Sequence, residues 1–189
     1  MSVLVVDDTV EVRQAIVAML KSACYKDIAT VSSAVEALAF LGIPDKLHEP
    51  CSVELVLMDV NMPGIDGLEG CRRIKAAPER KDIPVIVLTG NRDPGILQAS
   101  FTAGASDYLA KPPHPLELLA RVKSALGLKR EMDHRKLAHI SDLENKNREL
   151  EVAYRQLEAK NRELEEASIA KTQILSTATH ELKTPLTSM

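Results

Sequence analysis

Aromatic residues are scarce in this sequence: Phe, Tyr and Trp make up 3% of its 189 residues, and Trp is absent. Hydrophobic residues nevertheless account for 45%, so the apolar material is almost wholly aliphatic. An aliphatic interior is typical of parallel sheets covered on both faces and less typical of a β-sandwich. The length suits one domain of ordinary size, about 100–150 residues, followed by an extension.

Three further absences exclude other classes of protein. The cysteines, Cys24, Cys51 and Cys71, are too few and too widely spaced for a disulfide framework or a zinc site. The net charge of −3 provides no basic surface for nucleic acid or an anionic membrane. The sequence has neither an apolar run of ~18 residues nor a basic-then-apolar leader. We therefore expect a cytoplasmic segment without nucleic-acid or membrane contacts, and a membrane span elsewhere in a longer parent chain stays open.

Short aliphatic runs alternate with stretches of helical periodicity up to about residue 128. The runs are 3–6, 28–31, 55–58, 85–88 and 108–110, and the helical stretches are 9–22, 34–42, 67–77, 94–103 and 115–126. Because the runs do not alternate apolar with polar residues, they predict strands buried on both faces. The order of elements predicts an α/β fold with a five-stranded, doubly wound parallel sheet.

A different pattern follows, without Gly or Pro until Pro185. Two sets of residues recur every seven positions, namely Leu143, Leu150, Leu157 and Leu164, and, three residues ahead of them, Ile140, Asn147, Tyr154 and Asn161. A solvated single helix shares the charged composition but not this spacing. Asn residues that pair across the seam of a coiled coil, here Asn147 and Asn161, favour two parallel helices. Residues 127–172 therefore predict a homodimer through a parallel coiled coil. A basic zipper that reads DNA fits poorly, because Glu131 and Asp133 interrupt the basic residues.

Polar side chains stand at the ends of the predicted strands. Asp7 and Asp8 follow the first, Asp59 the third, Thr89 the fourth and Lys111 the fifth. The carboxyl ends of parallel strands meet at one edge of a sheet, where ligands bind. Carboxylates ~4 Å apart repel by about 4 kcal/mol per pair at an effective dielectric near 20, and Mg²⁺ relieves this repulsion. A metal, an ammonium and a hydroxyl around a carboxylate suit phosphoryl transfer to that carboxylate. An Asp-Asp pair without the other residues is more often a helix cap.

Residues 1–126 resemble the receiver domain of two-component response regulators, through the motifs VLVVDD, LVLMDVNMPGIDG, VIVLTG and GASDYLAKP. The resemblance implies a flavodoxin-like fold with Asp59 as the phosphoacceptor. It also implies that Asp8, Asp59 and the backbone carbonyl of Asn61 hold Mg²⁺, with Asp7 acting through water. The long connection over residues 42–52 departs from the family pattern without touching the acidic residues.

The same resemblance assigns roles to the residues near the fourth and fifth strands. Thr89 and Lys111 would contact the phosphoryl oxygens, and Tyr108 would reorient together with Thr89. The peptide bond between Lys111 and Pro112 would be cis, a conformation effectively confined to bonds that precede proline.

The last stretch, STATHELKTPLTSM, contains His-Glu-Leu-Lys-Thr-Pro. A His-Glu-x-x-His zinc motif is excluded, because Thr184 stands where the second His is needed. Residues 173–189 resemble the start of the dimerisation and phosphotransfer domain of histidine kinases. The resemblance implies that His180 is the phosphoacceptor, that Glu181 assists its proton and that Thr184 helps to place water for dephosphorylation.

Together these resemblances predict a receiver that regulates a histidine kinase through a coiled coil. The sequence shows no nucleotide-binding motif, so we expect ATP to bind only in a further C-terminal domain of a longer parent, and this chain alone to have no kinase activity. The expected partners are a second copy and a phosphodonor histidine protein or kinase domain. The alternative is a non-enzymatic phosphorelay or dimerising scaffold with a receiver input.

Overall fold

The structure is a computed structural model that describes residues 2–45, 51–90 and 94–183, with side chains described as far as Leu175. The chain divides into two compact units, residues 1–134 and 135–189. The first contains a sheet with its covering helices, and the second consists of helix in its described part.

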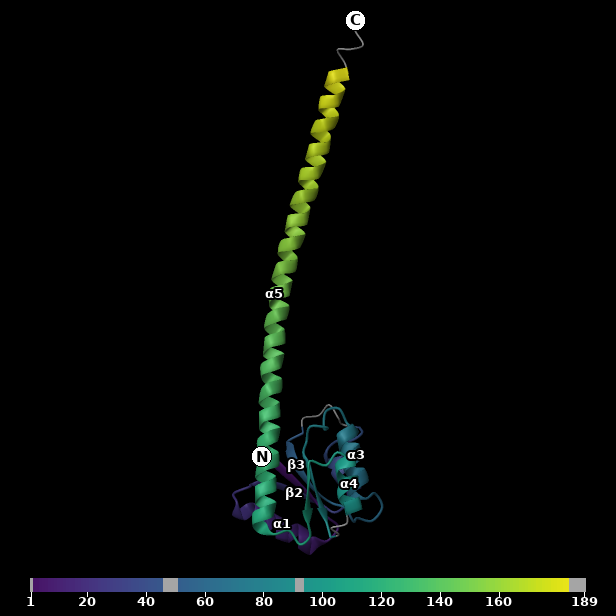
Figure 1. Cartoon of the computed structure of the whole chain (residues 1–189), viewed down its shortest axis with the longest axis vertical. Coiled ribbons are helices and arrows are strands. Elements are labelled where there is room, and N and C mark those ends of the chain that lie inside the picture. The colour runs from purple at the N-terminus through teal and green to yellow at the C-terminus, as the bar shows by residue number, and fades with distance from the viewer. Residues whose placement is uncertain (1, 46–50, 91–93, 184–189) are drawn as a thin grey trace. The chain divides into compact units, whose positions relative to one another are not determined.

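A five-stranded parallel sheet forms the centre of the first unit, with strand order β2-β1-β3-β4-β5. Figure 1 shows this sheet, with its strands β2 and β3 labelled. The strands are β1 Ser2–Val6, β2 Asp27–Val31, β3 Val53–Asp59, β4 Val85–Thr89 and β5 Asp107–Ala110. The helices are α1 Val10–Ser22, α2 Ala34–Phe40, α3 Gly67–Ala76, α4 Pro94–Thr102 and α5 Pro115–Lys183. The predicted α/β fold is confirmed, and each predicted strand begins within two residues of its observed start.

Alternate residues of the inner strands point to opposite faces and enter two separate apolar clusters. Val3 and Val5 pack with Leu118 of α5 and with α1, whereas Leu4 and Val6 pack with α2 and α3. Both faces of β1, β3 and β4 are buried, as predicted. For the two edge strands the prediction is wrong: no residue of β2 is fully buried, and in β5 only Leu109 is.

Helix α5 begins on the sheet and runs for 69 residues, passing through Gly127 without a break. Its first turns bury Leu118, Val122, Ala125 and Leu126 against the sheet. Beyond residue 134 the side chains are exposed as far as they are described. In the part of the chain that the structure describes, no helix is both long and apolar enough to cross a membrane.

Replacing Gly127 by Ala should stabilise the first unit. Gly in a helix interior costs about 0.5–1 kcal/mol relative to Ala, and a Cβ at Gly127 would meet no heavy atom within 4 Å. We expect Gly127→Ala to raise the free energy of unfolding by up to ~1 kcal/mol in urea denaturation followed by circular dichroism. A lower free energy of unfolding in the variant would contradict the helical, open environment of this glycine.

Candidate functional site

The predicted polar residues gather at the carboxyl edge of the sheet. Asp7 and Asp8 directly follow β1, while Asp59 and Thr89 are the last residues of β3 and β4. The backbone N–H of Lys111, just past β5, donates a hydrogen bond of 2.8 Å to the carbonyl of Thr89. Because all five strands are parallel, residues more than 100 positions apart in sequence meet at one edge, as the sequence predicted.

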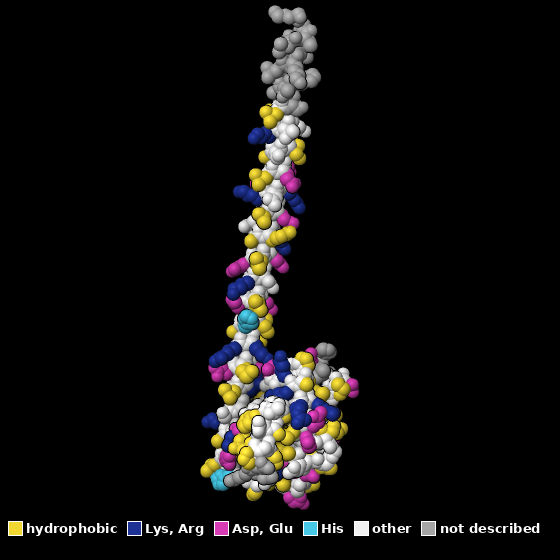
Figure 2. All heavy atoms as spheres, turned by 45° about the vertical axis from the view of Figure 1, so that its right-hand side comes forward, with side chains coloured by type: hydrophobic (Ala, Val, Ile, Leu, Met, Phe, Trp, Pro, Cys, Tyr) yellow, Lys and Arg dark blue, Asp and Glu magenta, His cyan; other side chains and the backbone are white. Residues whose placement is uncertain are grey.

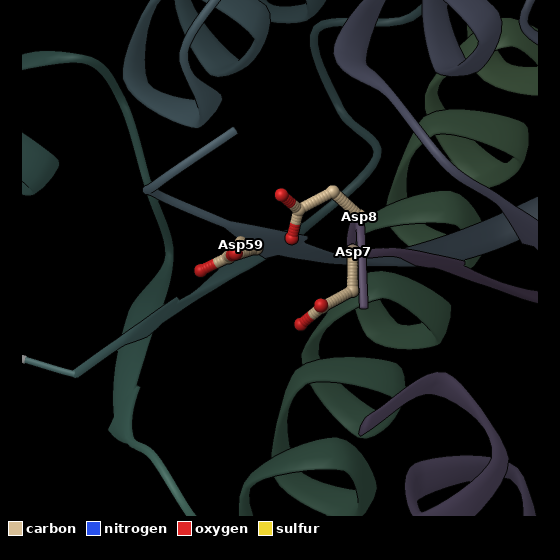
Figure 3. Close-up of side chains that lie close together, drawn as sticks. All are labelled: Asp7, Asp8 and Asp59. Carbon is tan, nitrogen blue, oxygen red and sulfur yellow. The ribbon is translucent and has the colours of Figure 1, made fainter. Parts of the chain in front are cut away.

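Three carboxylates form the centre of this acidic pocket, which we define as Asp7, Asp8 and Asp59 (Figure 3). One carboxylate oxygen from each lies within 4.8 Å of the other two. Asp7 is 0% exposed and Asp59 2% exposed, whereas Asp8 faces solvent. Two of the three acids are therefore held away from water, where charge repulsion is strongest.

Lys111 is the cation that reaches into the acidic pocket. Its Nζ lies 2.5 Å from Asp7 Oδ2 and 2.8 Å from Asp59 Oδ2, and its side chain is 18% exposed. Burial raises the pKa of the Asp59 carboxyl, and the hydrogen bond from Lys111 opposes that rise. One ammonium against three carboxylates leaves a negative excess that a divalent cation would neutralise.

The unpaired oxygen of Asp59 gives an independent test of whether a metal fits. Among the described residues, Asp59 Oδ1 is buried and has no hydrogen-bond partner. Asp7 Oδ2 has no hydrogen bond either, although it forms the ion pair with Lys111. Buried carboxylate oxygens without donors are costly unless a cation or another ligand meets them. Such oxygens beside the exposed carboxylate of Asp8 suit a site that takes a cation or a phosphoryl group, and Mg²⁺ prefers oxygen ligands.

Local hydrogen bonds hold Asp7 in place. Its Oδ1 accepts a hydrogen bond of 2.9 Å from the backbone N–H of Thr9, and its backbone carbonyl accepts one from Arg13 Nη1. Thr9 is the N-cap of α1, but its side chain makes no capping hydrogen bond to the helix. Asp8 accepts a hydrogen bond of 3.2 Å from Thr9 Oγ1. Helix capping therefore does not account for the acidic pair.

The loop after Asp59 and the start of α3 are packed closely against the acidic pocket. The backbone N–H of Gly67 donates a hydrogen bond of 3.0 Å to the carbonyl of Val60. A Cβ at Gly67 would lie 1.8 Å from the carbonyl oxygen of Asp59. Asn61, the expected source of a backbone ligand, lies in the same loop, and its N–H lowers the pKa of Asp59. The sequence carries no local signal for the role of Gly67, because a close approach of two backbones depends on segments that are distant in the chain.

Tyr108 lies between an aromatic ring and a cation on the neighbouring helices. Its ring is 6.1 Å from that of Phe101 in an edge-to-face arrangement, and the guanidinium carbon of Arg121 lies 5.5 Å from its centroid. Arg121 Nη1 also lies 2.5 Å from Asp107 Oδ1, and Nη2 lies 2.9 Å from Glu117 Oε1. These acidic partners raise the pKa of Arg121, so it stays charged over the ring. Tyr108 could be predicted from the sequence, whereas its ring contacts with Phe101 and Arg121 could not.

The remaining predicted residues fall into two groups. The peptide bond between Lys111 and Pro112 is cis, as the resemblance implied. The backbone of His180 and Glu181 is part of α5, but the side chains of these two residues lie outside the described part of the structure. Thr184 lies wholly outside the described residues.

Comparison with known proteins identifies the first unit. The family profile described as response regulator receiver domain matches residues 3–123. The chain is 39% identical over 107 residues to the cyclic di-GMP phosphodiesterase response regulator RpfG of Xanthomonas campestris, covering 51% of this chain and 28% of RpfG. The match to the transcriptional regulatory protein YvrH of Bacillus subtilis covers 48% of that protein. This chain therefore spans about half or less of the length of these two curated relatives.

Solved structures of receivers share this fold. A response regulator from Chloroflexus aurantiacus is 36% identical to this chain, with a TM-score of 0.60. The match covers 67% of this chain and 97% of the solved chain. The receiver domain of the sensor histidine kinase PA1611 from Pseudomonas aeruginosa is 29% identical, with a TM-score of 0.58 and the same coverage. That structure has a magnesium ion coordinated in its active site cleft. The chain therefore belongs to the response regulator receiver family, whose domains are phosphorylated on an aspartate in two-component signalling and bind Mg²⁺ at the acidic pocket.

Proposed function

We propose that Asp59 is the aspartate that accepts the phosphoryl group. The observation that carries this proposal is its buried Oδ1, which has no hydrogen-bond partner among the described residues while Oδ2 pairs with Lys111 at 2.8 Å. An oxygen without a donor keeps its lone pairs available for attack on phosphorus. Asp8, Asp59 and the Asn61 carbonyl would hold Mg²⁺, with Asp7 acting through water, and the ion would neutralise the transferring group.

The other residues of the pocket position and neutralise the phosphoryl group. When the Asp59 oxygen bonds to phosphorus, the bond from phosphorus to the donor's imidazole nitrogen breaks, and the imidazole takes up a proton from solvent. Lys111 would turn from the carboxylates towards the new phosphoryl oxygens, and the hydroxyl of Thr89 would donate to another. Positioning and charge neutralisation provide most of the catalysis in such transfers.

We also propose that the second unit dimerises as a parallel coiled coil. The leucines at 143, 150, 157 and 164 are between 47% and 67% exposed, so the single helix leaves this stripe uncovered (Figure 2). If they occupy position d of the heptad, Lys146 and Lys160 at g face Glu151 and Glu165 at e of a parallel partner. An antiparallel partner would instead place e opposite e, which brings Glu against Glu. The charges therefore favour the parallel arrangement.

Two Leu→Lys substitutions should dissociate this dimer. Leu150→Lys with Leu157→Lys places four charges in the seam of a dimer, at a cost of several kcal/mol in all. Sedimentation equilibrium should then give the mass of one chain, 20.7 kDa, instead of twice that value. Glu149→Lys with Gln156→Lys is the matched control, because both positions lie on the outer face, and this pair should remain dimeric. A monomeric parent chain would refute the coiled-coil proposal outright.

The dimer would present His180 to a partner domain. The His-Glu-Leu-Lys-Thr-Pro motif supports a histidine kinase, with His180 as phosphoacceptor, Glu181 assisting its proton and Thr184 placing water. In a longer parent, ATP would bind in a further domain. A neutral imidazole is a good nucleophile near neutral pH, which suits this role.

The contacts of Tyr108 suggest how phosphorylation could reach the coiled coil. Thr89 ends β4 beside the acidic pocket, and Tyr108 lies on the neighbouring strand, where its ring contacts Arg121 of α5 at 5.5 Å. A cation over an aromatic ring contributes about 0.5–2 kcal/mol, so movement of the ring would change the hold on α5. We propose that this contact passes the state of Asp59 into the helix.

Phosphorylation should therefore alter distances within the dimer. With cysteine substitutions and spin labels at Ser141 and Glu166, beryllium fluoride and Mg²⁺ as the phosphoryl mimic should shift the inter-helix distance distribution. Complete switching needs ~5.5 kcal/mol of differential stabilisation, so we expect a partial shift. Arg121→Ala should reduce that shift without preventing the mimic from binding. Unchanged inter-helix distances at both labelled sites in fully modified dimers would contradict the coupling proposal.

A further inference from the structure

A cavity lies at the end of the sheet opposite to the acidic pocket. It has a volume of about 570 Å³ and lies between the connection from α1 to β2 and the face of α5 around Gly127. Its lining residues are Ala23, Cys24, Tyr25, Lys26, Asp27, Lys123, Leu126, Gly127 and Arg130. Since Asp27 is the first residue of β2, this basal pocket lies at the amino ends of the strands. It shares no residue with the site described above.

The basal pocket has an excess of positive charge in a chain whose net charge is negative. Lys26, Lys123 and Arg130 line it against a single carboxylate, that of Asp27. The carbonyls of the last turn of α1 do not oppose an anion strongly, because Leu20 and Lys21 accept hydrogen bonds from the N–H groups of residues 23–25. The pocket therefore favours an anionic ligand over a cation or a neutral molecule.

Gly127 is the second observation that points to a ligand. A glycine in the middle of a helix costs stability, and here no neighbouring atom requires its small size, since a Cβ would meet nothing within 4 Å. The open space beside Gly127 is instead part of the pocket. Any longer side chain at this position would project into that space, so the glycine keeps the pocket open.

We propose that the basal pocket binds a phosphorylated small molecule of nucleotide size. The cations would bind the phosphate groups through charge-assisted hydrogen bonds. The ring of Tyr25 and the backbone at Gly127 would contact the organic part. A volume of about 570 Å³ falls in the range of small-molecule sites, about 300–1,000 Å³, and exceeds what one inorganic phosphate fills. A bound ligand would join the α1–β2 connection to α5 and stabilise the folded domain.

Titration of the full chain with ATP, AMP and pyrophosphate tests this proposal. The titrations are run with a metal chelator at low salt, and amide shifts of Tyr25 and Gly127 locate the binding. We expect ATP to bind with a Kd below about 1 mM and at least tenfold more tightly than pyrophosphate. Absence of saturable binding would overturn the proposal, and equal affinities for ATP and pyrophosphate would overturn its organic part.

Matched variants assign the binding to the pocket. Lys26→Gln with Lys123→Gln should weaken ATP binding at least tenfold, because each removes a charge-assisted contact. Lys21→Gln with Lys81→Gln makes the same change of charge outside the pocket and should leave the affinity within about twofold. Gly127→Leu should block binding while the helix remains at least as stable, so lost affinity would not reflect unfolding. Equal losses in both lysine pairs, or full affinity in Gly127→Leu, would refute the assignment.

Discussion

Asp59→Asn should take up no acyl phosphate from acetyl phosphate, whereas the parent chain should take up one. The substitution keeps the shape of the side chain but replaces the oxygen nucleophile with an amide. Intact-mass spectrometry in the presence of Mg²⁺ measures the modification, and chelation of Mg²⁺ should prevent it in the parent chain. Asp45→Asn is the control, because Asp45 is exposed and lies outside the acidic pocket. Phosphate that persists in Asp59→Asn would move the phosphoacceptor elsewhere.

The same variant should fold at least as stably as the parent chain. Burial raises the pKa of Asp59 more than the hydrogen bond from Lys111 lowers it, which means that the fold disfavours the charged carboxylate. A neutral amide removes one of three clustered negative charges. An acid whose pKa is raised in the folded state lowers the free energy of unfolding once the pH exceeds its pKa in the unfolded chain. The stability gained in Asp59→Asn should therefore be present at neutral pH and should fade as the pH falls towards the unfolded-state pKa of Asp. Urea denaturation at several pH values measures this, and a less stable variant would show that its inactivity reflects unfolding.

Gly67→Ala should be among the most damaging single-methyl changes in the domain. The added Cβ would lie 1.8 Å from the carbonyl oxygen of Asp59 and 2.7 Å from its carbonyl carbon, and neither atom belongs to a side chain that could rotate away. Either α3 must move or the end of β3 must shift, so we expect a loss of about 3 kcal/mol or more in the free energy of unfolding. Urea denaturation measures this loss.

Gly127→Ala is the matched control for this substitution, since the same chemical change should there be neutral or stabilising. Gly67→Ala should also slow phosphorylation, because the carbonyl it displaces belongs to Asp59, the proposed phosphoacceptor. A Gly67→Ala protein with parental stability would mean that α3 does not pack on Asp59 as closely as described.

Local patterns in the chain were enough to predict most of the first unit. Uninterrupted aliphatic runs identify buried parallel strands, because each such strand needs apolar side chains on both faces. Parallel order then places Asp7, Asp59 and Lys111 at one edge, without knowledge of any contact. The sequence left open whether the helix continues through Gly127, and the structure shows that it does, at a cost of only about 1 kcal/mol for one glycine in a long helix. These are inferences from spacing and intrinsic preference, which a sequence displays directly.

Contacts between distant segments could not be predicted in this way. Strand β2 has the same aliphatic character as the inner strands, yet its place at the edge leaves it half-exposed. The ion pairs of Lys111, the ring contacts of Tyr108 with Phe101 and Arg121, and the approach of Gly67 to Asp59 each join residues from different elements. The basal pocket likewise exists only because α5 packs beside the α1–β2 connection. Such features depend on how helices and strands pack in three dimensions, and neither residue spacing nor composition records those distances.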